Sequence, residues 1–409
     1  MDVLFLHPNF PGQFRRLAAA LAREPEVQVW GMGDQAWVPA DLELPGVRLL
    51  RYPHVPEGVA TAHPWSRNFE RAVRRGDQVI RTLAEHKRKG LEPDVIVAHP
   101  GWGDAFFVRD FFPGARVVGY FEYYYRIRGA DVGFDPEFPA HFNDIFRLHA
   151  DNATQLLALE SCDAAVCPTR WQKGLFPPAY DGKLRVQHEG IDTMLVQPDP
   201  QAEVRLRDGR ALRQGNEVLT YVSRNLEPYR GFHVFMRALP RILRERPDCQ
   251  VLVVGAEGTS YGPAPRSGGS WKEVYLNELR NALDLNRVHF TGILSYGEYL
   301  KVLQVSRVHV YLTYPFILSW SLLEAMAAGC VLVASDTAPV SEFLQDGVSG
   351  RLFAFRDHER LATLAIDALA NPENHAHLAQ AARQTVVERM DFEAVALPAY
   401  RRLLDMDVK

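Results

Sequence analysis

Residues 217–233, EVLTYVSRNLEPYRGFH, decide how the rest of the chain is interpreted. The run that ends at Ser223 is apolar and β-branched, which is typical of a buried strand. Helical periodicity follows over residues 231–247, after a loop that holds Arg224 and Arg230. A strand, a loop and a helix form the repeating unit of a parallel sheet whose faces are covered by helices.

The same alternation continues on both sides of this unit. Residues 190–203 are polar and contain prolines, so they are the expected linker between two doubly wound α/β domains. We place these domains at 1–195 and 196–388, and we expect a helix at 389–409 to pack back on the first domain. Ligands of such sheets bind at the carboxyl ends of the strands, so the expected site is a cleft between the domains. The other strand-like runs lie at 3–8, 27–32, 47–52, 94–98, 115–126, 162–167, 249–255, 287–292, 308–314, 331–336 and 350–355.

The composition is that of an ordinary globular protein. The 409 residues are 47% hydrophobic and 23% charged, and the net charge of −4 argues against nucleic acid as a general partner. The 4 cysteines lack metal-binding spacing and fit a reducing compartment. We see no signal peptide at the start and no apolar stretch that could span a membrane, so we expect a cytoplasmic protein.

Arg224 and Arg230 lie beside the start of a helix. Guanidinium groups offer forked donors, and a helix N-terminus adds free N–H groups and a partial positive charge, so this loop could bind a diphosphate. The alternative is two surface arginines. The glycine-rich run at 253–258 allows either the close approach of a ligand or a plain turn, and the long Gly/Ser/Pro loop after it is either functional or inert.

Glu324 stands in SLLEAMAAGC, residues 321–330, which is otherwise apolar or small. A carboxylate is seldom buried without a partner. We expect Glu324 on the first turn of a helix, where it could accept two hydrogen bonds from a ribose diol. The alternative is a carboxylate that only complements the helix dipole.

These motifs together resemble the family 4, or group 1, glycosyltransferases of GT-B architecture. The resemblance runs nearly end to end and is strongest over about residues 219–355. Any one matching piece is weak, but their order and spacing are specific. The pieces are PGQFRRLAAAL (11–21), CDAAVCPTRWQKGLF (162–176), VSRNLEPYRGF (222–232), VLVVG (251–255), VHFTGILSYGEY (288–299) and LLEAMAAGCVLVASDTAPVSEFLQDGVSGRLF (322–353).

The resemblance implies two Rossmann-like domains facing across a cleft, and a role for each matching position. Arg224 and Arg230 would bind the donor diphosphate, with Arg230 standing where the family usually has lysine. Glu324 would hold the ribose hydroxyls, and residues 290–299 would lie against the nucleobase. The positions that we place in the donor site are Gly12, Gly255, Gly292, Tyr296, Ser319, Trp320, Ser321, Leu322 and Glu324.

One departure from the family pattern concerns the donor sugar. The family usually carries another glutamate eight positions before Glu324, which contacts the sugar, and this chain has Phe316 there. Sugar recognition must therefore differ. Ser319, or backbone N–H groups near Trp320, would replace part of that contact.

A second departure lies in the first domain, where the family often has a histidine near the transferred sugar. The run at 115–126 offers Glu122 instead, among tyrosines, and we count it with Arg224 and Arg230 as a catalytic candidate because a carboxylate could steady a positive anomeric centre. Alternatively, Glu122 pairs with Arg126 or Arg128 and the tyrosines belong to the core. Further candidates for contacting the acceptor or the sugar are His99, Tyr123 and Tyr124.

The helical stretch at 67–89 carries eight Lys and Arg residues against three acidic residues. It could contact an anionic membrane at the site of a lipid-linked acceptor, or it could be an ordinary solvated helix face.

The function that we expect is transfer of a sugar from a nucleoside-diphosphate sugar to a hydroxyl acceptor, with retention of configuration. We find no paired-aspartate motif after a strand, so we expect neither a metal nor another cofactor. The acceptor stays open: a polysaccharide, a lipid-linked oligosaccharide, a protein or a small molecule. The alternatives are a non-catalytic sugar-nucleotide-binding scaffold that partners an active transferase, and a sugar-nucleotide epimerase.

Overall fold

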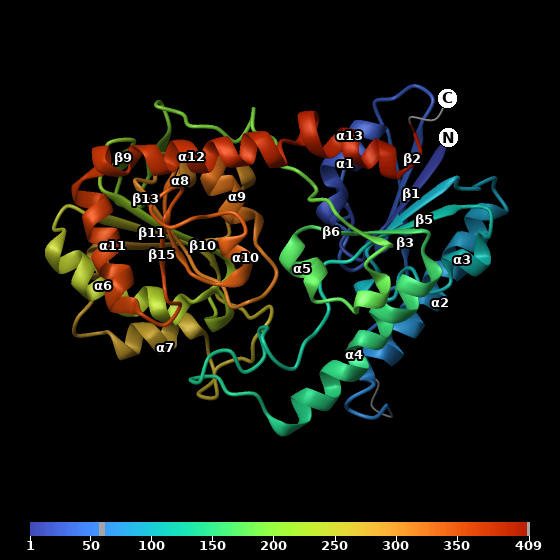
Figure 1. The fold of residues 1–409 in the computed structure, drawn as a ribbon, viewed down its shortest axis with the longest axis horizontal. Helices are drawn as coiled ribbons and strands as arrows, with labels where there is room; N and C mark the ends of the chain where they lie inside the picture. Colours follow the sequence, from blue (N-terminus) through green and yellow to red (C-terminus); the bar gives the residue numbers. More distant parts are fainter. Residues whose placement is uncertain (57–61, 407–409) are drawn as a thin grey trace. The chain divides into compact units, whose positions relative to one another are not determined.

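The computed structural model describes residues 1–56 and 62–406, and within these residues the chain forms two compact units. The first unit contains Met1–Gly190 and Phe392–Lys409, and the second contains Ile191–Asp391. The last positions of the helix expected at 389–409 lie outside the described residues. Each unit has a parallel sheet with helices on both faces, which confirms the predicted doubly wound fold (Figure 1).

The sheet of the first unit has the strand order β3-β2-β1-β4-β5-β6-β7, and every pair in it is parallel. Its strands are β1 (Asp2–Leu6), β2 (Gln28–Asp34), β3 (Val47–Tyr52), β4 (Val95–Ala98), β5 (Arg116–Tyr120), β6 (Ala164–Cys167) and β7 (Leu184–Val186). The α-helices are α1 (Arg15–Leu21), α2 (Arg67–Lys87), α3 (Val108–Phe111), α4 (Phe142–Ser161), α5 (Arg170–Gly174) and α13 (Leu397–Leu403). Shorter helical turns are η1 (Gly12–Phe14), η2 (Pro100–Trp102), η3 (Pro178–Tyr180) and the π-helix η6 (Phe392–Ala396).

Alternation along the central strand divides the core of the first unit into two layers. Leu4 and Leu6 face a layer built with α2, α3 and α4. Val3 and Phe5 face the opposite layer, which α1, η6 and α13 complete. The C-terminal segment is therefore part of the core of the first unit. Arg116 fixes it further, because its Nε donates to the carbonyl of Leu403 and its Nη1 pairs with Asp405 at 3.0 Å.

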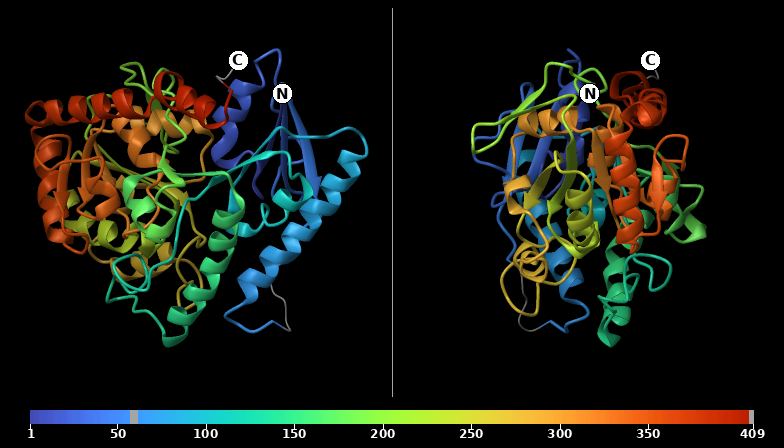
Figure 2. Two further views of the ribbon diagram at one scale, coloured as in Figure 1. Left: turned by 45° about the vertical axis from the view of Figure 1, so that its right-hand side comes forward. Right: turned by 90° about the vertical axis from the view of Figure 1, so that its left-hand side faces the viewer.

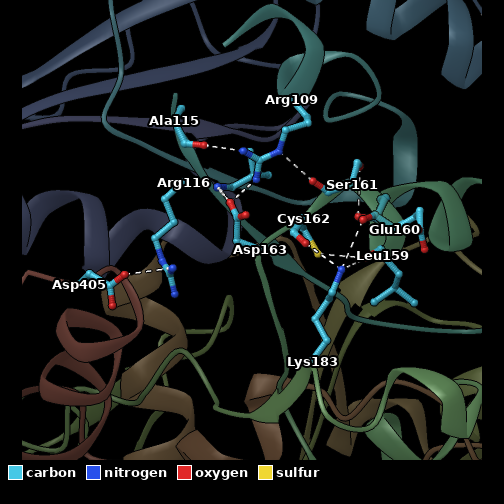
Figure 3. Close-up of polar contacts among 12 residues, drawn as sticks. Arg109, Ala115, Arg116, Leu159, Glu160, Ser161, Cys162, Asp163, Lys183 and Asp405 are labelled. Carbon is cyan, nitrogen blue, oxygen red and sulfur yellow. Dashed lines mark hydrogen bonds and ion pairs between the residues drawn. The ribbon is translucent and has the colours of Figure 1, made fainter. Parts of the chain in front are cut away.

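Helix α4 was not predicted, and it lies beside α2 in both views (Figures 1 and 2). Figure 3 shows how its carboxyl end is held. The Lys183 Nζ donates to the carbonyls of Leu159 (2.7 Å) and Cys162 (2.8 Å), which the helix leaves without intrahelical partners. Arg109 donates to the carbonyl of Ser161 and pairs with Asp163 in the same cluster.

The predicted basic helix is confirmed as α2, and part of its charge is engaged within the chain. Arg75 is 1% exposed, and Arg74, Arg81 and Lys87 form ion pairs with nearby carboxylates. Membrane contact through this helix stays a prediction. Among the described residues, the chain has no helix with the length and apolarity needed to cross a bilayer.

The sheet of the second unit has the order β12-β11-β10-β13-β14-β15, again entirely parallel. Its strands are β10 (Val218–Asn225), β11 (Gln250–Ala256), β12 (Val288–Gly292), β13 (Val308–Tyr311), β14 (Val331–Ser335) and β15 (Arg351–Phe353), and the hairpin strands β8 (Glu203–Arg205) and β9 (Ala211–Arg213) stand apart. The α-helices are α6 (Phe232–Glu245), α7 (Trp271–Glu278), α8 (Tyr296–Val305), α9 (Trp320–Ala327), α10 (Ala338–Ser341), α11 (His358–Ala370) and α12 (Pro372–Met390), and the 3-10 turns are η4 (Pro228–Arg230) and η5 (Leu285–Arg287).

Helices α8, α9, α10 and α12 cover one face of this sheet, while α6 and α11 pack together on the other. Two local predictions are wrong. The strand expected to end at Ser223 continues to Asn225 because it still pairs with β11 there, and the run expected to be one strand at 115–126 stops at Tyr120.

Candidate active site

Arg224 and Arg230 both lie at the carboxyl end of β10, the central strand of the second sheet, but in different environments. Arg224 is exposed, and its guanidinium has no hydrogen-bond or ion-pair partner among the described residues. Arg230 ends η4 and is only 6% exposed. Its Nη1 donates to the Thr313 Oγ1 (2.8 Å) and to the carbonyl of Ile317 (2.9 Å), both of which are neutral.

Gly231 lets Arg230 reach this position. It has φ +67° between η4 and α6, a conformation that side chains disfavour. A Cβ there would come within 2.4 Å of the Leu312 Cβ, just past the end of β13. The turn therefore brings the arginine against the neighbouring strand only because residue 231 has no side chain.

The long glycine-rich loop after β11 is tied to the same turn. Glu227 has 0% exposure, and its carboxylate accepts hydrogen bonds from the backbone N–H groups of Tyr261 (3.1 Å) and Gly262 (3.0 Å). Ser260 donates to it as well, at 3.1 Å. One buried carboxylate thus organises three backbone donors, and it places the Tyr261 ring 5.2 Å from the Arg230 Cζ.

Phe316, which replaces the usual first glutamate, belongs to an aromatic cluster over Arg230. Its ring lies 5.7 Å from the Arg230 Cζ, 4.8 Å from the ring of Tyr261 and 5.5 Å from that of Tyr229. Phe316 is 5% exposed. The guanidinium is therefore surrounded by aromatic rings and neutral acceptors, with the Glu227 carboxylate near enough to act on it electrostatically.

Glu324 is held by two tyrosines of helix α8. The hydroxyl of Tyr296 donates to Oε1 at 2.7 Å, and that of Tyr299 donates to Oε2 at 2.8 Å. The side chain is 3% exposed. The prediction that it stands on the first turn is wrong: Glu324 is the fifth residue of α9, because the helix begins at Trp320 with Ser319 as its cap.

The cap and the first three residues of α9 are four of the positions predicted for the donor site. Ser319 receives a hydrogen bond from the Ser321 backbone N–H, and its own N–H donates to the hydroxyl of Tyr311. Trp320 is half-buried, whereas Leu322 is fully buried and its side chain belongs to the core. Among these positions, a ligand could therefore meet the serines and Trp320 but not the Leu322 side chain.

Gly255 and Gly292 line one pocket of about 960 Å³, which runs along the edge strand β12 and is also lined by the hairpin residues 203–208. Phe290 and Lys272 line it too, and the ammonium lies 4.7 Å from the ring centroid. Gly292 has φ +72°, and a Cβ there would meet no described atom within 4 Å, so this glycine serves the turn into α8. Gly255 also serves packing, because a Cβ there would meet the Ser223 carbonyl at 2.7 Å.

In the first unit, the structure brings Gly12, His99 and Glu122 together at the carboxyl ends of β1, β4 and β5. The Gln13 Nε2 donates to the Glu122 Oε1 at 3.0 Å, and the His99 Nε2 lies 3.4 Å from Oε2. The side chain of Glu122 is 21% exposed. These contacts replace the predicted alternative, because Arg126 donates to the carbonyls of Leu175 and Phe176.

His7 belongs to this cluster although the sequence patterns did not single it out. Its Nδ1 accepts from the Asn9 N–H at 2.9 Å, so the proton of the neutral ring is on Nε2. Burial, and then the nearby His99, hold the pKa of His7 well below its usual range. Nε2 would lie 2.8 Å from a Cβ on Gly12, and the side chain of Gln13 lies close enough to act on the His7 pKa. The sequence signal that could have identified His7 is its position directly after the first strand, where ligands of parallel sheets bind.

Tyr123 and Tyr124 lie apart from the contacts just described, and their role as acceptor or sugar contacts stays a prediction. The segment turns after Tyr120, so the Tyr123 hydroxyl donates to Asp131 at 2.8 Å and the ring is 5% exposed. Tyr124 is partly buried, and its ring packs against the core 5.3 Å from that of Phe176. Over residues 1–56 and 62–406, no group of three or more His, Cys, Asp or Glu is placed to hold a metal ion.

Two units that each contain a doubly wound parallel sheet are typical of the GT-B fold, and solved structures of that class match this chain. HepE of Anabaena, solved with UDP and glucose, matches 99% of this chain and 100% of its own at a TM-score of 0.69 and 18% identity. Sucrose-phosphate synthase of Thermosynechococcus elongatus matches 99% of both chains at a TM-score of 0.72 and 19% identity. At these identities the likeness shows the fold alone.

Family models identify the group within that class. Residues 25–196 match the glycosyl transferase family 4 group, and residues 205–385 match the glycosyl transferases group 1. Glycogen synthase of Mycobacterium tuberculosis is 30% identical over 187 residues, 46% of this chain and 42% of that protein. Phosphatidyl-myo-inositol mannosyltransferase of Mycolicibacterium smegmatis is 27% identical over 292 residues, 63% of this chain and 70% of that protein. The chain belongs to the family 4, group 1 glycosyltransferases.

Proposed function

We propose that the protein transfers a glycosyl group from a nucleoside-diphosphate sugar to a hydroxyl acceptor with retention of configuration. The observation that carries this proposal is Arg230, a buried cation with neutral hydrogen-bond acceptors, next to the exposed Arg224. Glu227 is the carboxylate that acts on Arg230, but its oxygens already accept from three backbone N–H groups, so an anionic phosphate is a further favourable partner for the guanidinium. The relatives named mannosyltransferase and the neighbour solved with UDP support the same ligand class.

In this mechanism the bond between the anomeric carbon and the β-phosphate oxygen breaks, and negative charge builds on the departing phosphate. Arg224 and Arg230 stabilise that charge more strongly in the transition state than in the bound donor. The acceptor oxygen bonds to the anomeric carbon on the face that the phosphate leaves, and its proton passes to the phosphate. The step needs no metal. In the first unit, Glu122 is held by Gln13 and His99, and its role as a catalytic carboxylate stays a prediction.

Thermal unfolding tests the donor site. Wild-type protein and Arg224→Ala are heated with UDP, GDP, ADP, dTDP and CMP in turn, because a ligand that binds the folded state raises Tm by mass action. We expect one class of nucleoside diphosphate to raise the Tm of the wild type and to lose most of that effect in the variant. Absence of any shift would refute the proposed donor site.

The proposed acceptors are a glycan, a lipid-linked sugar or another hydroxyl compound. Turnover separates transfer from mere binding: a transferase releases free nucleoside diphosphate in proportion to glycosylated acceptor. A scaffold would bind the nucleotide without turnover, and an epimerase would interconvert donors with no acceptor present. The scaffold is a second candidate because Phe316 stands where the family usually has a glutamate that contacts the sugar.

A further inference from the structure

The contacts of Glu324 extend the proposed donor site, on which this inference rests. Both carboxylate oxygens already accept a hydrogen bond from a hydroxyl, one from Tyr296 and one from Tyr299. The two tyrosines are three residues apart on α8 and thus share one face of that helix. The side chains therefore present to Glu324 what a ribose would present, which is a pair of neighbouring hydroxyl groups.

The two tyrosines differ in how firmly they are held. Tyr296 is the first residue of α8 and is 43% exposed, and it follows the exposed Ile293 and the left-handed Gly292. Tyr299 lies one turn further on and packs against the core that α8 and α9 share. Burial, and then the charge of Glu324, raise the pKa of Tyr299 well above its usual range, so it stays a hydroxyl donor. Tyr296 is therefore the tyrosine that can leave the carboxylate with less disturbance of the core.

We propose that Tyr296 competes with the donor's ribose for Glu324 and is displaced when a ribonucleotide binds, while Tyr299 stays and positions the carboxylate. With Tyr296 in place Glu324 is only 3% exposed, so a ligand gains access to Oε1 when that ring turns away. When only a fraction of the protein molecules is in the state that can bind, the apparent affinity for the ligand is reduced by that fraction. The ligand class that follows is a nucleotide with an intact ribose diol, because the freed Oε1 can accept two hydrogen bonds and a 2′-deoxy sugar offers it only one hydroxyl.

Binding calorimetry on three proteins tests this: wild type, Tyr296→Phe and Tyr299→Phe. The probes are UDP, GDP and ADP, each with its 2′-deoxy form. We expect Tyr296→Phe to bind its preferred ribonucleotide about tenfold more tightly, since removing one competing hydrogen bond of ~1.4 kcal/mol changes Kd by that factor. The 2′-deoxy form is expected to gain less.

Tyr299→Phe is the matched control, because it removes the same hydroxyl from the other oxygen of the same carboxylate. We expect it to bind the ribonucleotide no more tightly than the wild type. If Tyr296→Phe leaves Kd unchanged or weakens binding, or if both variants tighten it equally, the competition is refuted while the donor site stands. If no nucleotide binds wild type or variants, the donor site and the competition both fail.

Discussion

Replacing Arg230 with methionine separates binding from stability. Methionine keeps much of the length and packing of the side chain but has no charge and no N–H donors. If Arg230 holds the diphosphate, the variant loses charge-assisted hydrogen bonds worth about 1.5–3 kcal/mol each. Two such bonds correspond to a rise in the Kd of the preferred nucleoside diphosphate of roughly a hundredfold or more.

The same substitution is expected to change the free energy of unfolding little when no ligand is present. It removes the two hydrogen bonds to Thr313 and Ile317, worth about 1 kcal/mol each after exchange with water. It also removes a guanidinium that is 6% exposed, so the loss of its desolvation penalty offsets part of this cost, while the attraction to the Glu227 carboxylate is lost as well. We therefore expect the variant to lie within about 2 kcal/mol of the wild type.

Calorimetry with the preferred nucleotide and urea unfolding of the free protein provide the two readings. Arg237→Met is the matched control, because Arg237 lies on α6 and forms a forked pair with Glu278 (2.7 and 3.1 Å). That control is expected to bind the nucleotide as tightly as the wild type and to lose about 1 kcal/mol or less of its free energy of unfolding. The reasoning would be refuted if Arg230→Met bound the nucleotide within threefold of the wild type, or if it unfolded several kcal/mol more easily.

Three further predictions concern the scaffold of the site. Glu227→Gln leaves one acceptor oxygen for three backbone donors, so the free energy of unfolding in urea should fall by about 2–4 kcal/mol and amide hydrogen exchange at 260–262 should become faster. Unchanged exchange would contradict the role of Glu227 in holding this loop. Gly231→Ala should destabilise the protein by about 2–4 kcal/mol in the same assay, because of its φ of +67° and the contact with Leu312, whereas Gly182→Ala, with nothing within 4 Å, should be nearly neutral. Burial lowers the pKa of His309 to about 3, so its contribution to stability is complete above the unfolded pKa of about 6.5 and is lost as the pH falls from there toward 3. Urea unfolding at pH 7.0 and 5.5 should show a loss of up to about 1.4 kcal/mol per pH unit from this residue, and His309→Gln should flatten the dependence.

The sequence predicts most strands of both sheets because each is a short apolar run bounded by turn residues. It does not predict β8 and β9, which are three residues each and carry charged side chains, so neither period nor hydrophobicity marks them. Helix α4 was missed although it ends at Ser161, directly before the strand run that was recognised. Motif order therefore predicts which segments form the sheets better than it predicts their connections.

The site shows the same division. Arg224, Arg230 and Glu324 could be singled out because residue type and position after a strand carry the signal. Their surroundings could not, since Tyr296 and Tyr299 lie 28 and 25 positions from Glu324, and Thr313 lies 83 positions from Arg230. Such contacts depend on how strands align in the sheet, and no local pattern encodes that alignment.

The chain passes between its two compact units twice, and the two passages are neighbours. Gly190–Ile191 and Asp391–Phe392 are the boundaries, and the Ile191 N–H donates to the carbonyl of Met390 at 2.7 Å, with an adjacent bridge from Ile191 to Asp391. The second unit is thus an insertion whose two ends meet, a geometry that tolerates excision and grafting. Residues 191–391 could therefore be exchanged for the corresponding segment of a relative by engineering only two peptide junctions, one at each end of the unit.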